Sequence, residues 1–136
     1  MAYSRREGTS SIDGEDTGRC VSSLPRALIL EIDPVHRRVM RRLMALLGFE
    51  VSATGAVEDA RAILVHEPVR YVLLGCGGPD HLDSLLTDLG VPDHVNLVVV
   101  SSQELAPIRR GFTFIRRPFS WPELRSAIRK HEMVGM

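Results

Sequence analysis

The chain has only two cysteines, and their placement does not match a disulfide framework or a zinc site. Cys20 and Cys76 lie far apart, and neither has a second metal-binding residue at the usual spacing. We therefore expect two reduced thiols and no bound metal.

Net charge, long apolar segments and aromatic residues are also absent or scarce. Lys and Arg number 17 and Asp and Glu also number 17, so no overall charge attracts nucleic acid or a membrane surface. No apolar run approaches the roughly 20 residues that cross a bilayer, and no secretory signal follows the N-terminal arginines. Aromatic residues make up 5% of the chain, which leaves few stacking positions for nucleic acid bases. These absences predict a cytoplasmic protein that makes no membrane contact.

Apolar residues are rare at the beginning of the chain and common after it. Residues 1–25 are mainly Ser, Gly, Thr, Asp, Glu and Arg, which bury too little surface to offset the entropy of ordering. We expect this segment to be a disordered tail. Residues 26–136 are long and apolar enough to fill one core, so they predict a single domain.

Within that domain, short apolar runs alternate with amphipathic stretches. The runs predict strands at 27–32, 49–55, 69–76, 95–102 and 111–115, and the stretches predict helices at 34–48, 57–68, 81–90 and 120–132. Asp33 before Pro34 is a typical N-cap, and Ser120 and Glu123 have the spacing of a capping box. This alternation predicts a parallel sheet covered on both faces.

Two details of the helices are specific enough to test. The fourth connection, 103–110, has eight residues and contains Pro107, so it predicts a single turn or an irregular loop in place of a helix. The first helix has an apolar face of Val35, Val39, Leu43 and Leu46. His36 falls beside that face, and we expect a partly buried packing residue rather than a ligand or a base.

The order of these elements resembles the receiver domain of two-component response regulators. Residues 26–133 carry the resemblance, above all LILEIDPVHRRVMRRLMALLGFEVSATGAVEDARAIL and FIRRPFSWPELRSAIRK. The resemblance implies an α/β, flavodoxin-like, doubly wound sheet of five parallel strands in the order 2-1-3-4-5. Here its fourth helix should be shortened or missing. The functional pocket should lie at the carboxyl ends of the strands.

The pocket of that family maps onto a small set of positions in this chain. They are Glu31, Ile32, Asp33, Gly75, Ser101, Phe114 and Arg117. Glu31 and Ile32 take the places of the metal-binding acidic pair, and Gly75 takes the place of the phosphoacceptor aspartate. Ser101 takes the place of the hydroxyl, and Arg117 that of the lysine. Phe114 stands at the aromatic switch position.

These substitutions predict a degenerate receiver without phosphorylation chemistry. Gly75 offers no carboxylate nucleophile, and Ile32 offers no oxygen ligand to the Mg²⁺ that holds a transferring phosphoryl group. We therefore expect no catalysis, no cofactor and weak or absent metal binding. Glu31 and Arg117 should form a charge-assisted pair across the pocket, unless Arg117 points to solvent.

Simpler interpretations apply to several of these residues. Asp33 is more readily explained as an N-cap than as a ligand, and Ser101 is equally well explained as a strand-end hydroxyl. The loop GCGGP at 75–79 lacks the spacing of a phosphate-binding loop, so a permissive turn is favoured.

Arginines are the remaining candidates for a binding surface. They are Arg37, Arg38, Arg41, Arg42, Arg109, Arg110 and Arg116. A solvated helix face explains the first four as well as a partner site does. We favour a phosphorylation-independent regulatory module whose partner is another signalling protein, such as a kinase, a regulator or an effector, or a second copy in a homodimer. Nucleic-acid or polyanion binding is the alternative, and phosphotransfer is the least favoured.

Deleting residues 1–22 should leave the thermal midpoint of unfolding unchanged, because a polar tail buries almost no apolar surface. Differential scanning calorimetry of the full and shortened chains measures this. A clear drop in the midpoint would mean that the tail packs on the domain.

Overall fold

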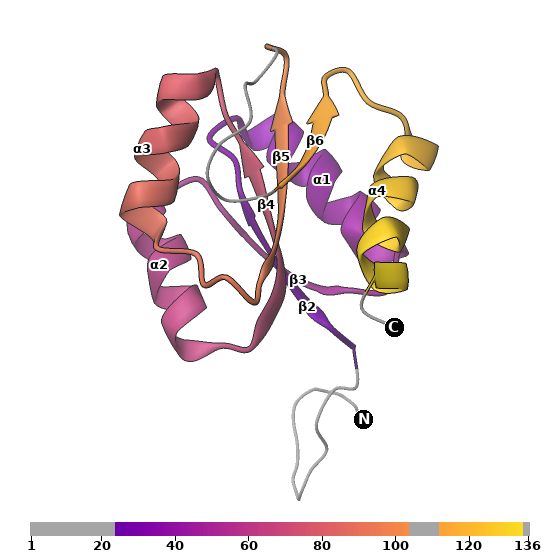
Figure 1. Cartoon of the computed structure of the whole chain (residues 1–136), viewed down its shortest axis with the longest axis horizontal. Coiled ribbons are helices and arrows are strands. Elements are labelled where there is room, and N and C mark those ends of the chain that lie inside the picture. The colour runs from indigo at the N-terminus through magenta and orange to yellow at the C-terminus, as the bar shows by residue number, and fades with distance from the viewer. Residues whose placement is uncertain (1–23, 104–111, 135–136) are drawn as a thin grey trace, which may run out of the picture.

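The structure is a computed structural model that describes residues 24–103 and 112–134, and its elements form one parallel sheet with helices on both faces (Figure 1). In chain order they are β2 (Arg26–Leu30), α1 (Pro34–Leu46), β3 (Glu50–Thr54), α2 (Val57–His66), β4 (Val69–Gly75), α3 (Pro79–Leu89), β5 (Asn96–Ser101), β6 (Thr113–Arg116) and α4 (Trp121–Val134). The sheet order is β3-β2-β4-β5-β6 and every pair is parallel. Counted along the described chain this is 2-1-3-4-5, which confirms the predicted flavodoxin-like topology.

Each described element lies within a few residues of its predicted position. No boundary differs by more than two residues, and α3, for example, begins at Pro79 and so starts two residues before the predicted helix. A proline at the first helical position explains the early start, since its missing N–H has no intrahelical partner there. The predicted tail at 1–25 and the predicted irregular segment at 103–110 fall almost wholly outside the described residues. Arg109 and Arg110 also lie outside them.

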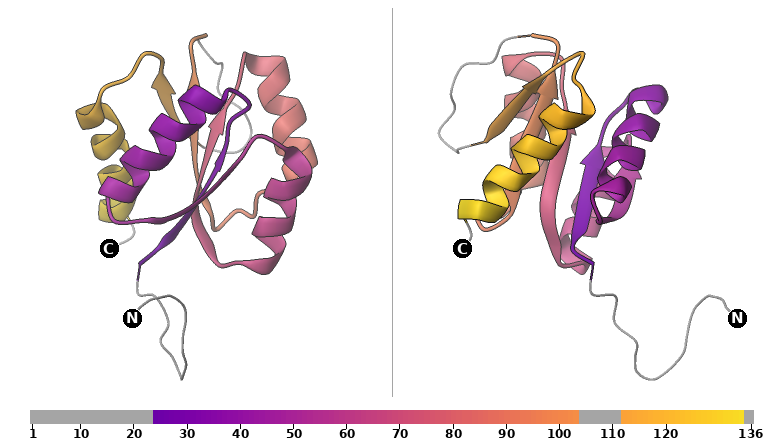
Figure 2. Two further views of the ribbon diagram at one scale, coloured as in Figure 1. Left: turned by 180° about the vertical axis from the view of Figure 1, so that it is seen from behind. Right: turned by 90° about the vertical axis from the view of Figure 1, so that its right-hand side faces the viewer.

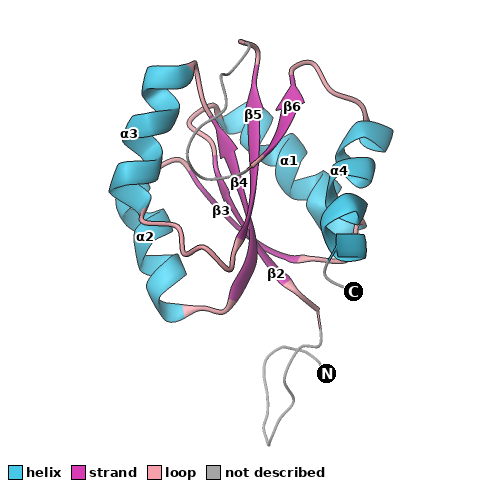
Figure 3. Cartoon of the chain, viewed as in Figure 1, coloured by secondary structure: helices cyan, strands magenta, loops and turns pink. Residues whose placement is uncertain are grey.

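The helices form two layers. Helices α1 and α4 cover one face of the sheet, and α2 and α3 cover the other (Figures 2 and 3). Alternate residues of β2 serve the two layers: Ala27 and Ile29 pack with α1 and α4, whereas Leu28 and Leu30 pack with α2 and α3. Every strand between the edges is therefore buried on both sides, as a parallel sheet requires. No helix of the described residues is long and apolar enough to span a membrane.

The predicted buried face of α1 is wrong except at Leu43, which is partly buried against the core. The fully buried residues are Met40 and Met44, whereas Val35, Val39 and Leu46 are exposed. The helix carries two apolar stripes, and the unbranched methionines fill the irregular space over the sheet. The side chain of His36 is 48% exposed, so its predicted packing role is wrong too. His36 lies in the first turn of α1, before the buried residues of that helix.

The orientation of α1 predicts unequal costs for two similar truncations. Met44→Ala should destabilise the domain by about 2–5 kcal/mol because it opens a cavity in the core. Leu46→Ala should change stability by no more than about 0.5 kcal/mol, since Leu46 is 70% exposed. Urea unfolding monitored by circular dichroism compares the two. Equal costs would place Leu46 in the core and contradict this orientation.

Candidate functional site

Four predicted site residues meet where the strands end. Glu31 directly follows β2, Gly75 ends β4, Ser101 ends β5, and Arg117 directly follows β6. Because these strands are parallel and in register, their carboxyl ends lie along one edge of the sheet. Sequence and topology together therefore bring into one site residues that are up to 86 positions apart.

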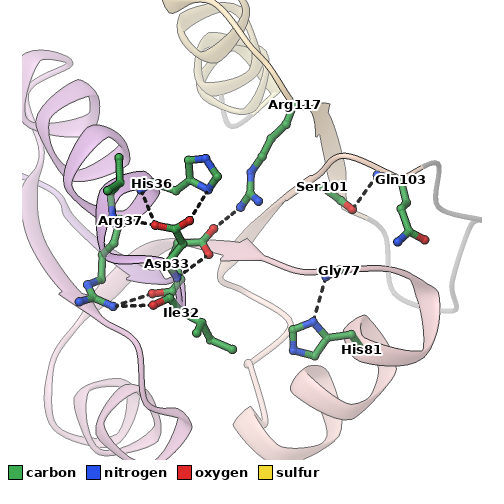
Figure 4. Close-up of polar contacts among 11 residues, drawn as sticks. Ile32, Asp33, His36, Arg37, Gly77, His81, Ser101, Gln103 and Arg117 are labelled. Carbon is green, nitrogen blue, oxygen red and sulfur yellow. Dashed lines mark hydrogen bonds and ion pairs between the residues drawn. The ribbon is translucent and has the colours of Figure 1, made fainter.

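Glu31 and Arg117 form the charge-assisted pair predicted from the sequence. Arg117 Nη2 donates to Glu31 Oε1, and the arginine side chain reaches from the end of β6 toward the loop that opens α1 (Figure 4). The two strands are three inter-strand spacings apart, roughly 14 Å, so two long side chains are needed to meet. The Glu31 side chain is 6% exposed and that of Arg117 is 19% exposed. Burial makes this contact stronger than an ordinary surface ion pair.

Gly75 provides the space in which the pair forms. A Cβ at this position would overlap Glu31 Oε1 and would lie 2.6 Å from Arg117 Nη2. The backbone of Gly75 does not adopt a positive φ, so the glycine is required here for room and not for conformation. Any side chain at 75 must displace the carboxylate or the guanidinium. An acceptor carboxylate at position 75 and the Glu31–Arg117 pair in its present geometry are therefore mutually exclusive.

A second arginine holds the backbone of the same loop. Arg37 Nη1 donates to the carbonyl oxygen of Glu31 at 2.8 Å and to that of Ile32 at 3.4 Å (Figure 4). A Cβ at Gly55 would lie 2.5 Å from Arg37 Nη1, so Gly55 leaves room for this side chain. Sequence analysis missed Gly55, and it placed Arg37 on a solvated face or a partner site. Arg37 instead has partners within the chain.

Asp33 is the N-cap of α1, as its position before Pro34 predicts. Its Oδ1 accepts from the backbone N–H of Val35 at 2.8 Å and of His36 at 3.4 Å. The bond from Val35 holds the pKa of this carboxyl below its ordinary value. The stabilisation is therefore present above the pKa of the unfolded chain and is lost as the pH falls through the folded pKa. The backbone N–H of Asp33 in turn donates to Glu31 Oε2 at 3.1 Å.

The remaining polar groups of the site either accept hydrogen bonds from nearby backbone N–H groups or are buried. Ser101 is fully buried and its Oγ accepts from the backbone N–H of Gln103 at 3.1 Å, as a strand-end hydroxyl does. Burial raises the pKa of the Cys76 thiol, so it stays protonated and unreactive near neutral pH. His81 Nδ1 accepts from the N–H of Gly77 at 2.9 Å, a contact that no sequence pattern indicated.

The other predicted residues take no part in these contacts, and most of them lie away from the site. Phe114 is half-buried on β6, and Arg116 is exposed at the end of the same strand. Arg38, Arg41 and Arg42 are exposed on α1. Ile32 is 65% exposed at the mouth of the site.

Mg²⁺, which the receiver resemblance implies, does not fit the residues at this position. It prefers several hard oxygen ligands in an octahedral array. Here Ile32 and Gly75 supply no side-chain oxygen, and the Glu31 carboxylate already accepts from Arg117 and from the N–H of Asp33. The cleft of about 530 Å³ above these residues is also lined by Arg117, whose positive charge opposes a cation.

Comparison with known proteins identifies the architecture. No protein-family model and no curated protein matches the chain. Among solved structures, a response regulator receiver domain from Methylobacillus flagellatus has a TM-score of 0.68 at 20% identity, covering 79% of this chain and 98% of that one. The PhyR receiver domain of Erythrobacter litoralis has a TM-score of 0.66 at 19% identity, covering 81% and 91%.

The chain has the receiver fold. A further match is the receiver domain of the sensor histidine kinase PA1611 from Pseudomonas aeruginosa, solved with a magnesium ion in its active site cleft. It has a TM-score of 0.64 at 17% identity and covers 79% of this chain and 97% of that one. These likenesses establish the shared receiver fold, and the chemistry must be argued from the residues in the site.

Glu31 and Arg117 should be energetically coupled. A double-mutant cycle on Glu31→Gln and Arg117→Gln, measured by urea unfolding, should give a coupling free energy of about 1–3 kcal/mol, as expected for a largely buried charged hydrogen bond. Arg116→Gln on the neighbouring exposed arginine is the matched control and should show no coupling to Glu31. A coupling of zero for Arg117 would mean that the contact contributes nothing to the folded state.

Proposed function

We propose that this chain is a receiver-type signalling module that binds a protein partner without phosphorylation and without catalysis. The observation that carries the proposal is the Glu31–Arg117 pair above Gly75. It occupies the space that a side chain would need at position 75, where a receiver of the ordinary kind has its acceptor carboxylate. With the Glu31 carboxylate paired to Arg117 and no carboxylate at position 75, the site lacks the groups on which a phosphorylation switch operates.

The pair also supplies a physical substitute for that switch. A transferred phosphoryl group acts by adding charge that orders nearby segments. Here a carboxylate and a guanidinium link the β2–α1 loop to the segment after β6 at all times, and a backbone bond from Arg117 N to Ser101 O at 2.9 Å adds to the link. The module is therefore held in one arrangement, and its output depends on which partner is present.

The fold supports a role in signalling, because the solved structures with this architecture include receiver domains of response regulators and of sensor kinases. One match is described as the anti-anti-sigma factor PhyR from Bartonella quintana, and this chain covers 47% of that protein. By analogy, we assign this chain a protein partner in a signalling pathway. Nucleic-acid binding is less well supported, because Arg37 and Arg117 have partners inside the chain.

Acetyl phosphate, beryllofluoride and Mg²⁺ should leave the protein unchanged. Two-dimensional amide NMR of the full chain measures this, since a filled receiver pocket shifts many amides around it. The Gly75→Asp variant should also fail to respond, because Arg117 remains paired with Glu31 and Ile32 still supplies no ligand.

A rebuilt pocket is the positive control for that experiment. The triple variant Ile32→Asp, Gly75→Asp and Arg117→Lys restores the acidic pair, the acceptor and the lysine, and it should show Mg²⁺-dependent shifts at millimolar metal. Clustered shifts around Glu31, Gly75 and Ser101 in the unmodified chain would contradict the proposed function.

A further inference from the structure

Strand β3 forms one edge of the sheet, and part of its backbone hydrogen-bonding capacity is unused. On its inner side the N–H of Glu50 donates to Pro25 O at 2.8 Å, and the parallel pairing with β2 continues to Thr54. Successive residues of a strand direct their backbone groups to opposite sides. The N–H and C=O groups of Val51 and Ala53 therefore point away from β2, and none of them has a partner within the described part of the chain.

This edge lacks the features that usually prevent a strand from pairing with another chain. Such features are a proline, a charged side chain or a bulge on the edge. Residues 51–54 include no proline and no charged residue, their register with β2 has no irregularity, and all of them are partly exposed. We call this stretch, residues 51–54, the β3 edge.

The β3 edge is held in its extended form by the loop of the candidate site. The N–H of Glu31 donates to Thr54 O at 3.0 Å, and Arg37 Nη1 binds the carbonyl oxygen of the same Glu31. The carboxyl end of β3 is therefore fixed to the loop that the Glu31–Arg117 pair orders. A strand that is already ordered loses less entropy when another strand joins it, so the site is preorganised.

The helices on either side of the β3 edge present opposite charges to it. Arg37 lies against Gly55, directly after β3, and the exposed Arg41 follows one helical turn later on the same side of α1. On the α2 side, the exposed Asp59 accepts from Thr54 Oγ1 through its Oδ2 at 3.4 Å. A strand that joins β3 therefore lies between a guanidinium on one face of the sheet and a carboxylate on the other.

We propose that the β3 edge binds an extended segment of a partner protein in which acidic and basic side chains alternate, an inference that rests on the proposed function and names the partner's chemistry. The segment adds an antiparallel strand, and two of its residues exchange hydrogen bonds with Val51 and Ala53. Val51 and Ala53 direct their side chains to the α1 layer, so the residues opposite them do the same. Those two residues are acidic and face Arg41, and the alternate residues are basic and face Asp59.

The flanking charges select this occupant over a second copy of the chain. Two antiparallel β3 strands, with a twofold axis at Ser52, would also satisfy the free backbone groups. That axis would bring Arg41 beside Arg41 of the second copy and Asp59 beside Asp59, and like charges in an interface cost affinity. A segment of alternating charge satisfies the backbone groups and both flanking charges.

Amide hydrogen exchange of the full chain, followed by NMR, tests the free edge and its occupation. Without a partner, the amides of Val51 and Ala53 should exchange at least about tenfold faster than those of Ser52 and Thr54, which donate to β2. The probe is a fluorescein-labelled peptide of about ten residues in which glutamate and lysine alternate between terminal threonines. At saturation it should slow the exchange of Val51 and Ala53 at least about tenfold and leave that of Ser52 and Thr54 unchanged.

Modified peptides separate backbone pairing from simple charge attraction, and fluorescence anisotropy gives their affinities. A peptide of equal composition with its glutamates and lysines in two blocks should bind at least about threefold more weakly. N-methylation of every glutamate should weaken binding at least about tenfold, because those amides face Val51 and Ala53. N-methylation of every lysine should leave binding unchanged, because those amides point away from β3.

Matched variants of the chain place the contact. Arg41→Glu should weaken binding of the alternating peptide at least about threefold, whereas Arg125→Glu, at an exposed arginine on α4, should leave it unchanged. Ala53→Pro should abolish binding and leave the fold intact, because proline is tolerated where the N–H points away from the ladder. Circular dichroism checks the fold of Ala53→Pro, and Arg41→Glu tests the proposal independently of it.

Several outcomes would overturn the assignment. They are equal exchange of all the β3 amides in the free chain, equal binding of the alternating and block peptides, indifference to N-methylation, or a dimer in sedimentation that Ala53→Pro dissolves. The proposed function fails separately. A beryllofluoride response in the unmodified chain would contradict it whatever the peptide does, whereas a silent pocket with no peptide binding would remove only the partner assigned to the β3 edge.

Discussion

The contact between Glu31 and Arg117 is the constraint on which the candidate site depends. It joins the end of β2 to the end of β6 across the two central strands, and both side chains are largely buried. Removing either partner would leave a charge in a poorly hydrated place, which is costly. Other residues of the site fit around this contact: Gly75 gives it room, and the N–H of Asp33 and the guanidinium of Arg37 hold the loop that carries Glu31.

The architecture was predictable because several independent patterns in the sequence agree. The period of the apolar residues, the N-cap at Asp33 and the near-continuous apolar runs of the central strands all favour one arrangement. The rotation of α1 was not predictable in the same way. Its sequence carries apolar residues on two sides, and periodicity alone does not say which side faces the sheet. In the folded protein the side with Met40 and Met44 packs against the sheet.

The site was predictable where it depends on topology and not where it depends on steric fit. Strand order brings Glu31 and Arg117 to the same edge, so their pairing followed from the sequence and the resemblance. The space above Gly75 and beside Gly55 exists only in three dimensions, because each glycine faces a side chain from a distant part of the chain. Arg37 belongs to the same class. Its spacing suggests an outer face of α1, yet its reach allows it to turn back to the carbonyls of Glu31 and Ile32.

The absence of a side chain at position 75 also makes some amino-acid substitutions in this site much more costly than others. A substitution that places a carboxylate at position 75 would push that side chain into space occupied by Glu31 and Arg117. It would break their buried ion pair, and no new hydrogen bond or metal ligand would compensate. Replacing Arg117 first leaves Glu31 unpaired. Either of these two steps, taken alone, therefore passes through a less stable protein. The pair therefore acts as a ratchet against gaining a carboxylate at position 75.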